Sequence, residues 1–195
     1  AWPPQEGGGG GGGAVGLGAG AHHGREETTT MCLVPAVADA CDIPVIAAGG
    51  LHDGRSILAA MMLGADAVQL GSRFVATPES SAHIAFKEAV LAAGEGATSL
   101  ELKDVTPVRL LHNDFAQQVI AAQQGGATPD ELRALLGRGR AKRGMFEGDL
   151  HEGELEIGQI AAMLDALEPA ADLVRRLAAE CRALGGPALG GRFDF

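Results

Sequence analysis

The stretch that decides the fold covers residues 43–73 and reads IPVIAAGGLHDGR followed by SILAAMMLGADAVQLGSR. Its apolar runs at residues 45–48 and 67–70 are typical of buried parallel strands. Residues 54–63 lie between them and carry apolar side chains at helical spacing, with Asp53 as the expected N-cap. Because a strand–helix–strand unit places its two strands side by side and parallel, this stretch predicts an α/β fold.

Glycines stand directly after both predicted strands, at Gly49, Gly50 and Gly71. The carboxyl ends of parallel strands are where α/β proteins bind ligands. A residue without a side chain lets backbone N–H groups approach an anion closely. The sequence therefore predicts a phosphate-binding site at these loops. The alternative is that the glycines serve only to make tight turns.

Other elements are predicted from capping residues and apolar stripes. Helices are expected at residues 33–40, from Thr77 to Gly94, from Thr128 to Gly137, and at residues 157–167 and 168–184. Because glycine loses much entropy on ordering, the tract at residues 7–18 is expected to be a flexible insertion in a surface loop. Residues 98–113 are expected to be irregular or extended.

Composition and charge exclude several classes of protein. The net charge of −10 argues against partners that are nucleic acids or anionic membrane surfaces. The sequence has neither a long apolar run typical of a transmembrane helix nor a signal-peptide pattern. Its 3 cysteines lack paired spacing, which suits a reducing compartment, so a cytoplasmic location is expected. His22 and His23 lack a supporting carboxylate or cysteine cluster, so no metal site is expected.

Two strong parallel strands are too few to close a barrel, which needs about 200–250 residues. We therefore expect the last part of a TIM (β/α)8 barrel followed by a C-terminal helical extension. The expected divisions are a Gly-rich segment at 1–18, the partial barrel at 19–95, the extension at 96–185 and a tail at 186–195. The outer strand edges at Ala47 and Val68 are expected to be unpaired, which favours homo-oligomers or aggregation.

Four stretches carry a family resemblance. They are AGAHHG at residues 19–24, PVIAAGGLHDGR at 44–55, LGADAVQLGSRF at 63–74, and EGD at 147–149 with GQ at 158–159. Together they resemble the nitronate monooxygenases, flavin-dependent enzymes also called 2-nitropropane dioxygenases, and the related FMN-dependent enoyl-acyl carrier protein reductases. The match covers the C-terminal half of the family's usual length. The resemblance implies a barrel of the FMN-binding aldolase type.

The resemblance also implies the roles of individual residues. The FMN phosphate would be held by Gly49, Gly50, Gly71 and Ser72, with Gln69 nearby. His22 aligns with the family's active-site histidine. A histidine with a pKa near neutrality can remove the proton next to a nitro group, or donate a hydrogen bond to the nitronate that results. The implied function is the oxidative denitrification of nitronates or nitroalkanes, with O2 as acceptor.

Three other functions remain open from the sequence. Enoyl-thioester reduction with a nicotinamide donor would use the same phosphate site. A purine-nucleotide dehydrogenase of the inosinate type shares the glycine pattern but needs a cysteine in a Gly-Ser-x-Cys loop, a setting that none of Cys32, Cys41 and Cys181 has. The chain could also be a truncated, non-catalytic fragment. A separate alternative is that His22 and His23 are a pair of exposed loop histidines. The coding sequence upstream of Ala1 would discriminate a fragment from a complete enzyme.

Overall fold

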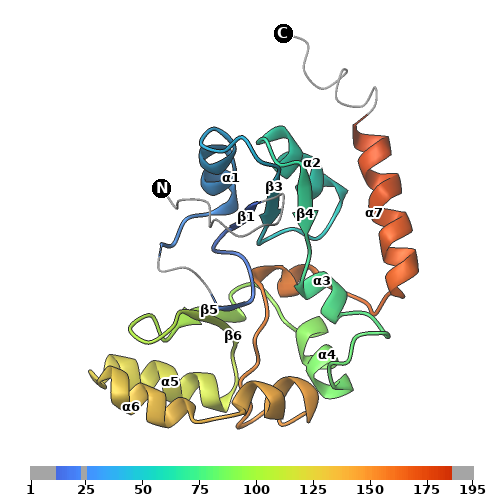
Figure 1. Cartoon of the computed structure of the whole chain (residues 1–195). Coiled ribbons are helices and arrows are strands. Elements are labelled where there is room, and N and C mark those ends of the chain that lie inside the picture. Colours follow the sequence, from blue (N-terminus) through green and yellow to red (C-terminus); the bar gives the residue numbers. More distant parts are fainter. Residues whose placement is uncertain (1–11, 23–25, 186–195) are drawn as a thin grey trace.

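The computed structural model describes residues 12–22 and 26–185 (Figure 1). Its first sheet has three parallel strands in the order β1-β3-β4, namely β1 (Gly12–Val15), β3 (Val45–Ala48) and β4 (Ala67–Gln69). Strand β3 is central, because Ala47 lies opposite Ala14 on one side and opposite Val68 on the other. The predicted α/β character and the parallel pairing of the strands after Pro44 and Asp66 are confirmed.

Helices α1 (Thr30–Ala38) and α2 (Gly54–Met62) pack against the parallel sheet. Helix α2 begins at its predicted cap, because an Asp53 carboxylate oxygen accepts a hydrogen bond from the Ser56 N–H at 2.9 Å. It ends before Gly64, whose φ of +100° favours glycine. Helix α7 (Ala170–Leu184) lies along α2 and begins two residues after the start that its sequence predicts.

A second sheet is antiparallel, in the order β2-β6-β5. Its strands are β2 (Ala21–His22), β5 (Thr98–Glu101) and β6 (Val108–Leu111), and the helices beside it are α5 (Asp114–Gln124) and α6 (Pro129–Leu136). Figure 1 shows this sheet with α5 and α6 below the parallel sheet. Phe115, Leu110 and Leu132 form its buried core. The segment expected to be irregular or extended therefore forms the β5–β6 hairpin.

Four short elements connect the two sheets: α3 (Ser72–Val75), α4 (Ile84–Leu91), the π-helix η1 (Lys142–Phe146) and the 3-10 helix η2 (Gln159–Met163). They enclose a core that includes Phe86, Val90, Ile157 and Ile160. In the described part of the chain, no helix is long and apolar enough to cross a membrane.

The expectation of a flexible insertion at residues 7–18 is wrong for its second half. Gly12–Val15 forms β1, and the Gly16 N–H donates to the Ala48 carbonyl at 2.9 Å. The outer edge at Ala47 is therefore paired, contrary to expectation. The expectation of an unpaired outer edge holds for β4, which pairs only with β3 among the described residues. Ala67 and Gln69 of this strand are exposed.

Two predicted helices differ from the structure. The helix expected from Thr77 begins at Ile84 instead, because the buried Lys87 ammonium binds the carbonyls of Thr77 and Ser80, each at 2.8 Å, and holds that segment in turns. The helix expected at residues 157–167 is a single stretch of 3-10 helix, η2, after which the chain is extended at Leu164.

Candidate functional site

A pocket of about 290 Å³ opens at the carboxyl ends of the three parallel strands. The loops after β1, β3 and β4 line one part of the pocket, and the segment 156–160 and Met145 line the rest. This is the edge of the sheet where the sequence predicts ligand binding.

All five residues expected to bind the cofactor line this one pocket: Gly49, Gly50, Gln69, Gly71 and Ser72. Gly49 and Gly50 lie in the loop after β3, whereas Gln69 ends β4, Gly71 follows it and Ser72 begins α3. These residues lie in two separate stretches of the sequence. The parallel pairing of β3 and β4 brings them together in the structure.

Gly50 and Gly71 are open toward the pocket. A Cβ atom added to either residue would meet no other atom within 4 Å. Within residues 12–22 and 26–185, neither backbone N–H donates a hydrogen bond. These two N–H groups are therefore free to bind an anion that occupies the space a side chain would fill.

Gly49 has a different role. Its φ is +95°, and a Cβ there would stand 2.5 Å from the Gly16 carbonyl oxygen. Its own carbonyl accepts a hydrogen bond from the Thr30 hydroxyl at 2.6 Å. Gly49 is therefore required for close packing of the loops after β1 and β3, and this packing shapes the pocket wall.

The Ser72 hydroxyl already accepts one hydrogen bond. Its Oγ accepts a hydrogen bond from the Gly158 N–H at 2.8 Å. A hydroxyl group can accept and donate at the same time, so its own proton is available to a ligand. No Lys or Arg side chain is among the described residues that line the pocket. An anion bound there would be held by N–H and O–H dipoles, a donor set that fits a phosphate group.

Two further glycine loops complete the pocket. A Cβ on Gly18 would lie 3.1 Å from the Gly50 nitrogen, and a Cβ on Gly20 would lie 2.7 Å from the Gly158 nitrogen. The Gln159 N–H donates to the Gly18 carbonyl at 3.0 Å. The Gly-Gln pair at 158–159 is one of the stretches that carry the family resemblance. Met145, Glu156 and Ile160 also line the pocket and have no motif that could have indicated them.

His22 lies in the backbone of β2, opposite Val108 of β6. Its side chain is outside what the structure describes, and His23 lies outside the described residues. The strand follows directly after Gly20, which lines the pocket.

Arg109 was not indicated by the sequence and holds this region together. It is buried, and its Nη2 donates to the Leu17 carbonyl at 3.0 Å. Arg109 also lies opposite Ala21 in the antiparallel sheet. It therefore connects the strand that carries His22 to the loop that leaves β1.

The nitronate monooxygenase family has a sequence model that matches residues 8–180 of this chain. The chain belongs to this family. A nitronate monooxygenase of Pseudomonas aeruginosa is 35% identical over 86% of this chain and 50% of its own length. A Rhodococcus jostii protein is 32% identical over 84% of this chain and 56% of its own length. It is named (3aS,4S,5R,7aS)-5-hydroxy-7a-methyl-1-oxo-octahydro-1H-indene-4-carboxyl-CoA dehydrogenase.

Among solved structures, FabK from Thermotoga maritima is similar, with a TM-score of 0.87 and 35% identity. The alignment covers 95% of this chain and 58% of FabK. The chain thus spans about half the length of these two relatives and of FabK.

Proposed function

We propose that this chain is the phosphate-binding part of an FMN-dependent oxidoreductase that acts on nitronates or nitroalkanes, with O2 as acceptor. The observation that carries the proposal is the convergence of Gly50, Gly71 and Ser72 on one pocket. Their two glycine N–H groups and the Ser72 hydroxyl proton are donated to no other group within residues 12–22 and 26–185. The family membership supports the same class of cofactor.

In this proposal the FMN phosphate occupies the space in front of Gly50 and Gly71. The N–H groups of both residues and the Ser72 hydroxyl donate to its oxygens. Gln69 lies at the end of β4, beside the same pocket, and its amide can both donate and accept hydrogen bonds. When bound, FMN would supply the redox chemistry, which no side chain of the pocket can provide.

His22 is the proposed catalytic residue. A neutral imidazole there would remove the proton from the carbon next to the nitro group, or donate a hydrogen bond to a nitronate oxygen. The support is its place in the chain. One residue, Ala21, separates it from Gly20, which lines the pocket, and Ala21 is paired with Arg109 in the antiparallel sheet.

We further propose that the parallel sheet is part of a TIM barrel, with residues 19–95 contributing barrel units and residues 96–185 forming the family's extension. The exposure of Ala67 and Gln69 on one face of β4 supports this, because parallel sheets are ordinarily covered on both faces. The relatives' greater length supports it as well. Complete activity would then need further strands, and a non-catalytic fragment is the outcome if they are lacking.

A second candidate function is redox chemistry on an acyl thioester, such as enoyl-thioester reduction. The observation in its favour is the Rhodococcus relative, whose name is that of a carboxyl-CoA dehydrogenase. The phosphate site would be the same for both substrates.

Flavin absorbance under anaerobic conditions distinguishes the candidates. The purified chain is loaded with FMN and mixed with ethylnitronate, or with NADPH followed by an enoyl-CoA. Bleaching by the nitronate supports the first function. Bleaching by NADPH that the enoyl-CoA reverses supports the second, and no bleaching with either supports a non-catalytic fragment.

The role of His22 is tested by His22→Asn, with His23→Asn as the control. We expect His22→Asn to retain FMN but to lower turnover of neutral nitroethane by about 10²–10⁴-fold, the usual contribution of general acid–base catalysis. The ionised nitronate should be affected less, because its proton is already lost. Equal losses for both forms of the substrate would exclude His22 as the base.

A further inference from the structure

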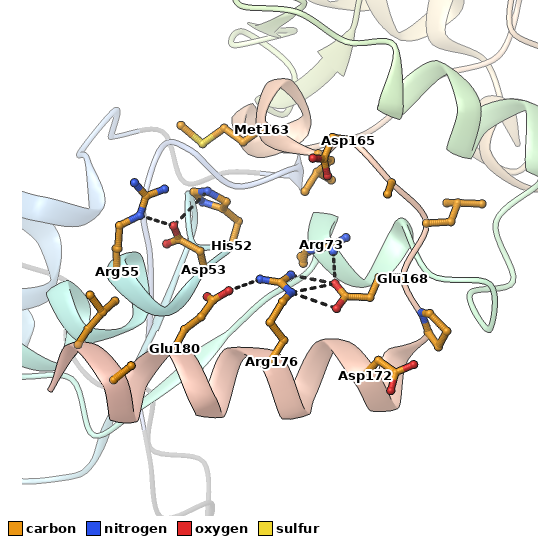
Figure 2. Close-up of a pocket in the computed structure, with 16 residues that line it drawn as sticks. His52, Asp53, Arg55, Arg73, Met163, Asp165, Glu168, Asp172, Arg176 and Glu180 are labelled. Carbon is orange, nitrogen blue, oxygen red and sulfur yellow. Dashed lines mark hydrogen bonds and ion pairs between the residues drawn. The ribbon is translucent and has the colours of Figure 1, made fainter. Parts of the chain in front are cut away.

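The loops that carry Gly50 and Gly71, the two phosphate loops, lead into α2 and α3, and the start of each helix contacts a carboxylate (Figure 2). After the Gly50 loop, the Gly54 N–H donates to Glu180 of α7 at 2.8 Å. After the Gly71 loop, the guanidinium of Arg73 is paired with Glu168, just before α7. Arg73, Glu168 and Glu180 line a different pocket, which shares no lining residue with the pocket that Gly50 and Gly71 line.

The approach of α7 to the first loop is unusually close. A Cβ atom on Gly54 would stand 2.5 Å from the Glu180 Cβ and 3.0 Å from the Cys181 nitrogen. Leu173 and Leu177 of α7 are buried together with Ile57 of α2. Helix α7 is therefore fixed against the start of α2, and Glu180 cannot shift without moving Gly54.

Arg176 joins the two carboxylates. Its Nη2 lies 2.8 Å from Glu168 Oε2, its Nε lies 3.0 Å from Glu168 Oε1, and its Nη1 donates to Glu180. Figure 2 shows its guanidinium between the two acidic side chains, with Arg73 above them and joined to Glu168. The contacts form one continuous chain from the Arg73 side chain to the Gly54 backbone. A planar guanidinium suits this position, because its donors can reach two carboxylates at once.

The chain of ion pairs is partly sheltered from water. Arg73 is 5% exposed, and the side chains of Glu168 and Arg176 are 20% and 38% exposed. The hydrogen bond to Glu168 raises the pKa of Arg176, although burial opposes this. The same hydrogen bond lowers the pKa of Glu168, again against the effect of burial. Both groups therefore stay ionised over the neutral pH range, and their attraction is stronger than that of a fully exposed pair.

We propose that Arg176 is a positioning residue that holds the two phosphate loops at the separation required by a single phosphate group. It acts through Glu180 on the Gly50 loop and through Glu168 and Arg73 on the Gly71 loop. Two backbone N–H groups can share one phosphate only when both loops converge on it, so a small movement of either loop weakens both contacts. The inference rests on the proposed FMN site.

The test compares Arg176→Met with Arg175→Met in the full 195-residue chain. Arg175 is the neighbouring residue on α7, its side chain is 71% exposed, and its ion-pair partner among the described residues is Asp172 alone. Dissociation constants are measured for FMN and for riboflavin, which lacks the phosphate, by quenching of flavin fluorescence. Residues that orient ligand-binding groups typically contribute about 10–100-fold to affinity at metal sites, and we expect a loss of about 10-fold for FMN in Arg176→Met.

Riboflavin affinity should be unchanged in Arg176→Met, and Arg175→Met should resemble the wild type with both ligands. Arg176→Lys should lose less FMN affinity than Arg176→Met, because an ammonium group can still bind one carboxylate. Hydrogen exchange of the ligand-free chain should accelerate at residues 50–54 and 71–73 in Arg176→Met but not in Arg175→Met.

An equal loss of FMN and riboflavin affinity, or no loss of either, would overturn the positioning role while leaving the phosphate site intact. A wild-type chain that binds FMN no more tightly than riboflavin would instead refute the phosphate site and with it the proposed function.

Discussion

Gly50→Asp separates the role of Gly50 in binding from its role in folding. Gly50 has a φ of +78°, and a Cβ there meets no atom within 4 Å. The substitution should therefore destabilise the fold only through backbone strain, by about 1–2 kcal/mol. The new carboxylate would enter the space assigned to the phosphate. Two like charges about 4 Å apart repel by about 4 kcal/mol at an effective dielectric constant of 20, which is about 10³-fold in affinity.

Gly126→Asp is the matched control for this prediction. Gly126 has a φ of +79°, a Cβ there would also meet nothing within 4 Å, and it lies between α5 and α6, away from the pocket. Both variants should show a similar small decrease in the midpoint of thermal unfolding. Only Gly50→Asp should show weaker FMN binding in a fluorescence titration. An FMN dissociation constant within about 3-fold of the wild type would refute the assignment of Gly50, since the expected repulsion corresponds to a much larger change.

Three other predictions concern stability and the loops around the pocket. Asp53→Ala should lower the free energy of unfolding, measured with urea at pH 7, by about 1–2 kcal/mol, because it removes the N-cap of α2. Burial opposes ionisation, but hydrogen bonds from Ser56 and Arg55 lower the pKa of Asp53 to about 2, so the difference from the wild type should vanish as the pH falls from 3.8 through 2. Burial and the nearby charge of Glu156 raise the pKa of Glu154 to about 7, so wild-type stability should fall as the pH rises from 4.5 to 7, and Glu154→Gln should abolish that fall; a parallel pH profile in the variant would contradict this. Arg109→Met should destabilise the chain by about 1–3 kcal/mol, because the partly buried hydrogen bond to the Leu17 carbonyl is lost, and hydrogen exchange should be faster at residues 17–20.

The sequence predicts the unit at residues 43–73 well because its information is local. Asp53 caps α2 through a residue three positions away, and Gly64 ends the helix through its own backbone conformation. The pocket glycines follow from the same unit. In contrast, β1 cannot be recognised from its own residues, because a glycine tract has no side-chain pattern. It is a strand because β3 offers it hydrogen bonds.

Non-local contacts explain the other differences. The segment after Thr77 has the residues of a helix start, but the Lys87 ammonium binds its carbonyls and stabilises turns instead. Met145 and Ile160 line the pocket only because η1 and η2 pack against α4. No spacing rule in the sequence connects them to the glycine loops. Arg109 was missed for the same reason, since its partner Leu17 lies in the loop after β1, 92 positions away in the sequence.

The contacts that close the pocket have a consequence for how the chain folds. The Gly158 N–H reaches Ser72 across 86 positions of the sequence, and the Gln159 N–H reaches Gly18 across a still longer span. Bringing such distant segments together costs loop-closure entropy and slows folding, so these contacts are expected to form after the hairpin and the α2 unit. A ligand that binds only the closed pocket would then stabilise the last stage of folding, and its effect on the midpoint of unfolding should rise with its concentration.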